Sequence, residues 1–472
     1  MLLIVAILTA PRAATLTVDP ASASDYPDIE TALLDASSGD IISLSAGSHS
    51  MCEYLNEVQL SFVGAGTSLT TVEVTSPCTA GFYLGTGVEL TIEDLTVDAS
   101  AASAIYMSTD NDVIATDVIF DGGQSSSQCA FINVLSSFTG TRVEFNNCGD
   151  GSEYLEGAAM YLWGSAEVTL TDSSFRDNQA GKGGAVFLNY FCGSPVLTLD
   201  EVTFENNFAV NDGGAIYLES AAVYSSGSSF INNTSQDGSG GAIGGGGYLE
   251  SIGDIFTGNT ASQRGGAIGD TQLNIEGARF SDNHADSGGA LALSYGSVVS
   301  GSVFNDNSAS TSGGAIDYSS SITFELSDSL FCANTAAQGG AISGEDYLST
   351  ILTQLRFAHN EASRRGGSLY LNVEGSTTEA ISQTELRQST VFGSTAPAAG
   401  EGVLLTGGNV VIHNTLLTHT DAGAGLHLGS VLSADVSHSG WYANTGGDVV
   451  GTTSIDLTTD GHVQADPLYV AA

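Results

Sequence analysis

Residues 256–268 of the chain read FTGNTASQRGGAI, and they contain the two signatures that decide the fold. The first is an aromatic residue followed three positions later by asparagine, here Phe256 and Asn259. The second is a glycine pair followed by a small and an aliphatic residue, here GGAI. Both recur in the same order eight times over residues 175–369, at a nearly constant spacing. A repeat of ~26 residues indicates a solenoid, whose units bury their apolar faces only by stacking.

The repeat unit has the spacing of strands. Apolar residues alternate over runs of four to six positions, as in residues 196–199, between clusters of Gly, Asn, Asp and Ser. Glycine supplies 59 of the 472 residues, which disfavours helix interiors. One coil of short strands per ~26-residue repeat predicts an all-β parallel β-helix of about sixteen coils, each strand pairing with its equivalent one coil later.

Each signature residue has an expected structural task. We expect the phenylalanines to point inward and to stack on one another, and the first glycine of each pair to take a positive φ at a corner. The asparagines are expected at another corner, where their side chains bond from coil to coil in a ladder. This predicted ladder comprises Asn178, Asn207, Asn233, Asn259, Asn283, Asn307, Asn334 and Asn360.

The alternation of GGAI-like and Phe-x-x-Asn motifs resembles the repeats of chlamydial-type polymorphic outer membrane proteins over about residues 145–370. More broadly, about residues 15–470 resemble the right-handed parallel β-helix superfamily that includes pectin lyases. The closer resemblance implies a surface-exposed passenger linked to adhesion. In that family a C-terminal membrane β-barrel exports the passenger, and no series of amphipathic strands of that kind follows the repeats here.

The sequence predicts one elongated domain, in which regular repeats are flanked by coils that match the repeat less well. A short helix over residues 31–36 is expected to cover the first coil, whose edge would otherwise pair with another chain. The last residues resemble a sequence motif that, in such proteins, is usually followed by further residues, and this suggests that the sequence is truncated. The expected segments are a signal peptide (1–14), an N-terminal cap and first strand (15–50), degenerate coils (51–165), repeat coils (166–370) and degenerate C-terminal coils (371–472).

Charge restricts the partners. Ten basic residues face 53 acidic ones, for a formal net charge of −43. Nucleic acid is excluded, because no basic patch could neutralise its phosphates, and polyanionic glycans and anionic membranes are disfavoured. A neutral glycan or a surface protein remains as partner, and no apolar run is long enough for a membrane helix. No cofactor is expected, although the acidic turns could hold calcium.

Six cysteines support export. Cys52 and Cys78 are separated by one repeat length, which is one coil and brings their Cα atoms within disulfide reach. Cys129 and Cys148 are closer together in the sequence and could bridge a corner. The other two cysteines lie more than five coils apart, so we expect them to be free thiols. Two disulfides agree with an extracellular or outer-surface location.

Two groups of side chains are candidates for chemistry. Glycoside hydrolysis needs two carboxylates at a suitable separation, and stacked coils could supply such a pair. Five of the eight histidines lie near the C-terminal end, and two of them are separated by about one repeat length, so they could stack and bind a metal with help from His419 or His427. The acidic candidates, alternatively solvated turn charges, are Asp270, Asp317, Glu345 and Asp346, and the metal-ligand candidates, alternatively surface imidazoles, are His413 and His438.

The sequence favours a secreted or cell-surface β-helix that acts by binding, as an adhesin does, without catalysis. The polygalacturonase-type cues are absent from the chain, and its arginines are scattered. Two alternatives remain open: a carbohydrate-active enzyme, lyase or hydrolase, with its site on one face of the β-helix, and a structural component of the cell envelope. Fold alone does not choose among the three.

Overall fold

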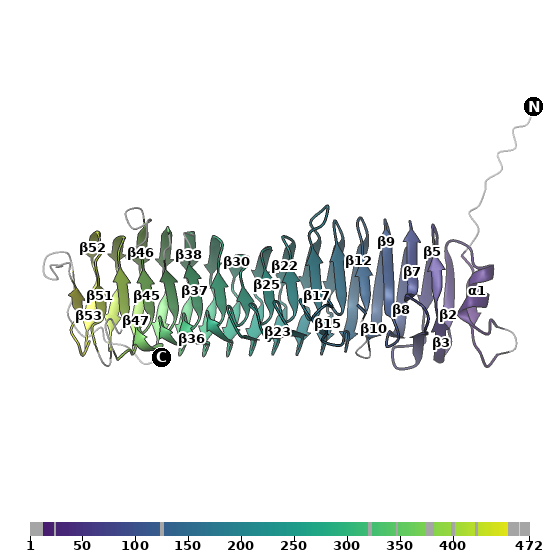
Figure 1. Cartoon of the computed structure of the whole chain (residues 1–472), viewed down its shortest axis with the longest axis horizontal. Coiled ribbons are helices and arrows are strands. Elements are labelled where there is room, and N and C mark those ends of the chain that lie inside the picture. Colours follow the sequence, from purple (N-terminus) through teal and green to yellow (C-terminus); the bar gives the residue numbers. More distant parts are fainter. Residues whose placement is uncertain are drawn as a thin grey trace, which may run out of the picture.

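Short strands wind into a single stack of coils, coloured from purple at the N-terminal end to yellow at the other end in Figure 1. Neighbouring coils pair in parallel throughout, and one strand of each of sixteen coils lies in the same sheet. The predicted all-β parallel β-helix of about sixteen coils is therefore confirmed. The computed structural model describes residues 13–22, 25–122, 127–319, 323–345, 348–373, 382–397, 402–420, 423–451 and 462.

Three parallel sheets run along the stack. Sheet A has thirty strands, because most coils cross it twice, as in β18 (Val196–Asp200) and β19 (Thr203–Glu205). Sheet C has eight short strands: β16 (Gln179–Ala180), β20 (Phe208–Ala209), β24 (Thr234–Ser235), β28 (Thr260–Ala261), β32 (His284–Ser287), β36 (Ser308–Ser312), β40 (Thr335–Gln338) and β44 (Glu361–Arg365).

Sheet B has one strand from each coil, and it carries the candidate site described below. Its strands are β4 (Glu53–Leu55), β7 (Ala80–Thr86), β9 (Ser103–Thr109), β11 (Ala130–Ile132), β13 (Met160–Trp163), β17 (Val186–Asn189), β21 (Ile216–Leu218), β25 (Ile243–Gly245), β29 (Ile268–Gly269), β33 (Leu291–Leu293), β37 (Ile316–Ser319), β41 (Ile342–Glu345), β45 (Leu369–Asn372), β48 (Val403–Thr406), β51 (Leu426–Leu428) and β54 (Val449–Gly451).

The helix α1 (Ile29–Asp35) lies at the N-terminal end of the stack (Figure 1). Asp28 caps it by accepting a hydrogen bond from the backbone N–H of Thr31 at 2.8 Å. Ile29 and Ala32 are buried, and the helix contacts β1 (Thr15–Val18) and β3 (Gly47–Met51). The helix therefore covers the first coil, as the sequence predicts, although it begins slightly earlier than expected.

The repeated phenylalanines form the core. From Phe145 to Phe357 their rings stack in one column, with centroids of successive rings 4.6 to 5.0 Å apart. The ring planes are close to parallel, as for Phe204 and Phe230, which are inclined by 2°. This spacing equals the distance between parallel strands, so identical residues stack whenever the strands are in register. One continuous buried apolar cluster extends from Val18 to Trp441.

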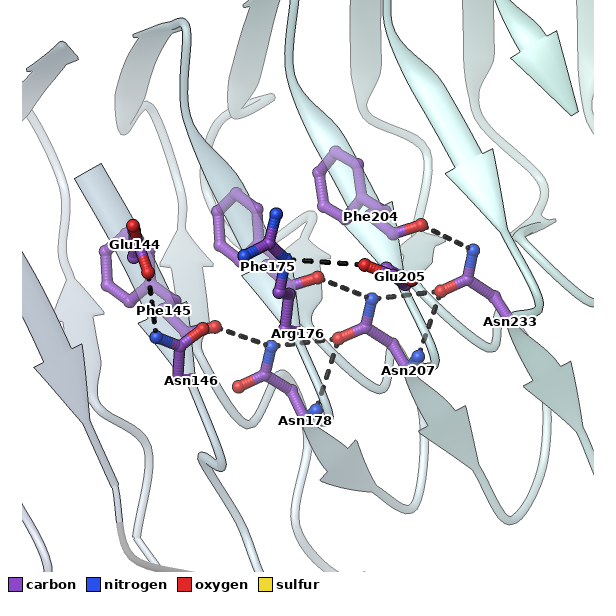
Figure 2. A network of polar contacts seen from close by, with 10 residues as sticks. All are labelled: Glu144, Phe145, Asn146, Phe175, Arg176, Asn178, Phe204, Glu205, Asn207 and Asn233. Atoms are coloured by element: carbon purple, nitrogen blue, oxygen red, sulfur yellow. Dashed lines mark hydrogen bonds and ion pairs between the residues drawn. The ribbon is translucent and has the colours of Figure 1, made fainter. Parts of the chain in front are cut away.

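The repeat asparagines form a buried row at the corner between sheets A and C (Figure 2). Each Nδ2 from Asn178 to Asn334 donates to Oδ1 of the asparagine in the next coil, at 2.8 to 3.0 Å. The same Nδ2 donates to the carbonyl of the phenylalanine one coil earlier, as from Asn207 to Phe175 at 3.0 Å. The row thus satisfies turn backbone groups that would otherwise be buried without partners.

A second row of polar side chains lies at the corner inside sheet A, where the sequence gives no regular motif. Ser228 accepts a hydrogen bond from Val202 N–H at 3.1 Å, and Ser329 accepts one from Ser302 N–H at 3.1 Å. The residue just before the row has a positive φ, as Glu201 does at 55°. A single residue with a left-handed backbone conformation therefore makes this corner. The backbone N–H that follows it donates a hydrogen bond to a serine hydroxyl in the next coil.

The structure joins Cys52 to Cys78 and Cys129 to Cys148, with Cα–Cα distances of 5.7 and 5.9 Å. Cys192 and Cys332 are free; the first is exposed and the second is half-buried. Both disulfides lie in the first third of the stack.

Candidate functional site

A row of aromatic side chains runs along the outer face of sheet B in its first seven coils. Successive strands place these rings in register, and the centroids of neighbouring rings are 4.7 to 5.5 Å apart. We call this row the aromatic ladder: Tyr54, Tyr83, Tyr106, Phe131, Tyr161, Phe187 and Tyr217. Tyr54, at the start, is 64% exposed, whereas Tyr161 and Phe187 are buried.

The aromatic ladder ends where the row continues as Gly244, Gly269 and Ala292. A Cβ atom at Gly244 would lie 2.8 Å from the carbonyl oxygen of Ser239, so the corner chain passes too close for a side chain. The small residues follow from this close approach of two backbone segments. The row therefore changes from large rings to a short stretch with almost no side chains.

Asp317 is the next residue of the row, in register with Ala292 on one side and Ser343 on the other. Its side chain is only 13% exposed. Asp270 also places its carboxylate beside Arg264, but it does so from a position after the end of its strand. It follows β29 directly, and its φ of 57° ends the strand and turns its carboxylate outward, where it meets Arg264 and Ser294. The structure thus brings together two of the four acidic candidates, although they occupy different offsets in their repeats.

Arg264 connects the two carboxylates. Its Nη1 donates to Oδ1 of Asp270 at 3.1 Å, and its Nη2 lies 3.8 Å from Oδ2 of Asp317. Ser294 also donates to Oδ1 of Asp270, at 2.6 Å. Nη2 is buried and has no hydrogen-bond partner within the described part of the chain. We call Arg264, Asp270, Ser294 and Asp317 the acid–arginine cluster.

Burial raises the pKa of the Asp317 carboxyl to about 6, and the negative charge of Glu345 adds to the shift. The hydroxyl of Ser312 and the guanidinium of Arg264 lower it, but burial dominates. Asp317 therefore holds its proton well above the pH at which an exposed aspartate would lose it. A buried carboxyl with a raised pKa beside a specific charge partner is typical of functional sites.

The other two acidic candidates contribute less. Glu345 ends β41, in register with Asn372 of the next strand, and its side chain is exposed. It acts on Asp317 through its charge. Asp346 lies outside the described residues.

A second polar group borders the end of the aromatic ladder. The ammonium group of Lys182, the chain's single lysine, lies 4.6 Å from the centroid of the Tyr217 ring. Burial raises the pKa of the Glu156 carboxyl, and Lys182 partly offsets that shift. Burial also raises the pKa of Tyr161 to about 12, while the side-chain N–H of Asn189 donates to its hydroxyl at 2.6 Å. Sheet B thus carries ionisable side chains on both sides of its small-residue stretch.

The predicted stacking of His413 and His438 is wrong. His413 is in register with Ser437, and His438 occupies the left-handed corner at the next position. The pairing step between these two coils is therefore one position shorter than the separation of the two histidines. His413 instead lies 3.4 Å from Asp435. Within the described ranges, no three His, Cys, Asp or Glu side chains converge in a way that could hold a metal ion.

Comparison with known protein families identifies the family to which the chain belongs. The sequence model described as "Right handed beta helix region" matches residues 58–221 and 158–331, which together exceed half of the chain. The chain belongs to this right-handed β-helix family. Curated proteins show no significant match to it. No helix in the described part of this β-helix protein is long and apolar enough to cross a membrane.

Several solved structures are similar to this β-helix protein in fold. The Agl-KA catalytic domain is 11% identical over 94% of this chain and 69% of its own, with a TM-score of 0.37. Tailspike protein 3 of bacteriophage CBA120 is 10% identical over 96% of this chain and 61% of its own, with a TM-score of 0.34. A mannuronic acid-specific polysaccharide family 6 lyase from human gut microbiota is 10% identical, covering 93% and 91%, with a TM-score of 0.33.

The sequence contained a signal for the aromatic ladder that motif reasoning missed. The ladder residue directly follows an inward-facing strand residue in every coil, but its type alternates between Tyr and Phe, and its spacing varies from coil to coil. Arg264 was missed because its significance depends on reaching Asp317 two coils later.

Proposed function

We propose that this protein is an extracellular carbohydrate-active protein that binds a neutral glycan on the outer face of sheet B and hydrolyses it at the acid–arginine cluster. The observation that carries the proposal is the buried Asp317, whose pKa of about 6 lets it keep a proton beside a second carboxylate. The exposed ring of Tyr54 and the half-buried rings of Tyr83 and Tyr106 offer apolar contacts to sugar rings. The net charge of −43 favours an uncharged polymer.

The proposed chemistry uses the two carboxylates in different roles. Asp317 donates its proton to the glycosidic oxygen as the bond to the anomeric carbon breaks. Asp270, held by Arg264 and Ser294, takes a proton from the water whose oxygen bonds to that carbon. Arg264 is a positioning residue, because it contacts both carboxylates. The reaction proposed here needs no cofactor.

The extracellular location is part of the proposal. Two disulfides are the kind of cross-link that persists in exported proteins. A signal peptide over residues 1–14 would agree with export, but residues 1–12 lie outside the described part of the chain.

A second candidate function is that of a surface adhesin, which binds its glycan or protein partner without turnover. The observation in its favour is the similarity of the repeats to those of polymorphic outer membrane proteins. The two functions share the binding face and differ only in whether the acid–arginine cluster breaks a bond.

The test is release of reducing ends from neutral polysaccharides (β-1,3-glucan, β-1,4-glucan, xylan and mannan) at about pH 5. We expect one of them to be cleaved, with a rate that falls as the pH rises above about 6, because Asp317 must be protonated. Asp317→Asn should lower kcat by roughly 100-fold or more.

Asp282→Asn serves as the matched control, because Asp282 is an exposed corner residue with a φ of 56° that asparagine adopts readily. Its activity should stay within about twofold of wild type. Binding to one of these glycans without release of reducing ends would reject hydrolysis and favour the adhesin. Absence of both binding and release would reject the glycan partner.

A further inference from the structure

A groove of about 800 Å³ lies on the outer face of sheet A, away from the acid–arginine cluster. It runs across five neighbouring coils, whose corner residues line one side of it. Five coils at one strand spacing each place the first and last corner residues ~19 Å apart. These corner residues are Asp94, Asp117, Arg142, Asp172 and Glu201, and each has a φ between 50° and 56°.

Two features of the chain bound the groove. At one end, residues 64–69 connect β5 (Gln59–Val63) to β6 (Thr70–Val74) with a longer turn than the single-residue corners of later coils, and this turn lines the groove. At the other end the lining stops at Thr203, and the next corner residues are Gly227 and Gly253. The groove therefore ends where charged corner residues give way to glycine.

Several polar groups of the groove are already paired within the protein. Arg142 donates from Nε and Nη2 to the two carboxylate oxygens of Asp117, both at 2.7 Å. This bidentate pair uses two of the five N–H groups of the guanidinium and leaves three. Arg176 lies 3.4 Å from Glu205, and Glu144 accepts a hydrogen bond from Asn146 at 3.1 Å (Figure 2).

The composition of the groove selects the ligand. Its walls carry five carboxylates and two guanidinium groups, and each guanidinium is already paired with a carboxylate. An anionic ligand would face the excess of negative charge. Among the described residues that line the groove none is aromatic, which gives an apolar peptide little to contact. Fixed acceptors next to fixed donors suit hydroxyl groups, because a hydroxyl both donates and accepts.

We propose that this groove is a second glycan-binding site, which holds about four units of a linear neutral oligosaccharide along the axis of the stack. It shares only the class of ligand with the proposed function at sheet B. It lies on another sheet, and its last lining residue, Thr203, lies two coils before Arg264, the first residue of the acid–arginine cluster.

The test is isothermal titration of the full chain with neutral hexasaccharides of glucose, xylose and mannose, in the Asp317→Asn background so that no probe is cleaved. We expect one probe to bind at this site, with an affinity that changes less than twofold between low and high salt. Arg142→Ala should weaken binding at least tenfold. Glu144→Gln, which keeps the shape of the side chain, should weaken it several-fold.

Arg279→Ala is the matched control, because Arg279 is exposed on the outer face of sheet A, three coils beyond Thr203. It should leave the affinity unchanged. Equal binding by wild type and both groove variants would overturn the proposal. Tight binding of spermine alone, lost at high salt, would also overturn it, because the groove would then be a cation site. Because Asp317→Asn can still bind glycan on sheet B, the loss of affinity in Arg142→Ala and Glu144→Gln is the result that assigns binding to this groove.

Discussion

Asn259 shows how much one side chain of the repeat does. Its Nδ2 donates to the carbonyl of Phe230 and to Oδ1 of Asn283, and its Oδ1 accepts from the backbone N–H and the Nδ2 of Asn233. All of these atoms are buried. The row links each coil to two others, so removal of one member leaves several polar groups without partners.

Asn259→Ala should therefore lower the free energy of unfolding by about 3–5 kcal/mol, since several buried groups lose their hydrogen bonds together. Asn274→Ala, at an exposed position of β30 (Gln272–Glu276) in the next coil, should cost less than about 0.5 kcal/mol. Urea denaturation followed by circular dichroism measures both. Equal effects of the two substitutions would contradict the structural role of the row.

Asp254 occupies the corner position that is Ser228 in the preceding coil and Ala278 in the following coil, and its side chain is fully buried. Its Oδ1 accepts from Ser228 N–H at 2.8 Å and its Oδ2 from the Ser251 hydroxyl at 2.7 Å. Burial nevertheless raises the pKa of its carboxyl, so these two hydrogen bonds do not fully compensate for desolvation of the charge.

A raised pKa in the folded state has a definite consequence for stability. The stabilising contribution is complete below the unfolded-state pKa and is lost as the pH rises through the folded-state value. Asp254→Ser should therefore increase the melting temperature relative to wild type at neutral pH, and much less near pH 4. Thermal unfolding at both values measures the difference. A larger gain at acidic pH would show that the sign is wrong.

The stacking of the phenylalanine rings and the hydrogen-bonded row of asparagines could be predicted, because each depends on a fixed spacing within the repeat. The meeting of Asp270 with Asp317 could only be proposed, since it depends on the left-handed backbone at Asp270 and on the length of Arg264. Neither property follows from spacing.

At the scale of the element, the glycine pair sets the distance between coils. A Cβ on Gly266, the second residue of its pair, would lie 2.1 Å from the carbonyl oxygen of Gly289 in the next coil. Gly277, at the corner of sheet A, differs: its φ is 68°, but nothing lies within 4 Å of a Cβ there. Gly266 is required because there is no room for a side chain, whereas Gly277 is favoured only because of its positive φ.

Gly266→Ala should destabilise the protein by more than about 4 kcal/mol or prevent folding, because a rigid backbone atom occupies the space. Gly277→Ala should cost only about 1–2 kcal/mol, the cost of a left-handed alanine. Urea denaturation of both variants measures the difference. Comparable losses would argue that coil spacing is not limiting at Gly266.

Register is also decided at this scale. Strand β49 (Asn409–His413) pairs with β52 (Ser433–Ser437), and their register places His413 opposite Ser437, one position before His438. When the number of residues between two paired positions changes by one, the side chain moves to the other face of the sheet, because neighbouring strand residues face opposite sides. Histidine spacing alone could not predict the pairing for this reason.

At the scale of the whole molecule, each coil contacts mainly its neighbours, so stability is distributed along the stack. Both disulfides lie within the first third. They should protect only that region, because a cross-link acts on the loop that it closes.

Replacement of Cys52 and Cys78 by serine should cost about 2–4 kcal/mol in the first coils and almost nothing beyond the middle of the stack. Hydrogen exchange measured by mass spectrometry should show faster exchange in strands near β4 and β7, and unchanged exchange in β33 and β37. Replacing the free Cys192 is the control. Uniform loss of protection along the chain would mean that the stack unfolds as one cooperative unit.

The sequence by itself determined the coil: its length, its strands, the stacked phenylalanines, the asparagine row and the parallel pairing. It could do so because a repeated residue meets its own copy one strand spacing away, so a local pattern is also a tertiary contact. Tertiary structure alone decided the acid–arginine cluster and the groove on sheet A. These depend on residues that are not repeated, and their contacts are set by corner geometry and by the reach of side chains across coils.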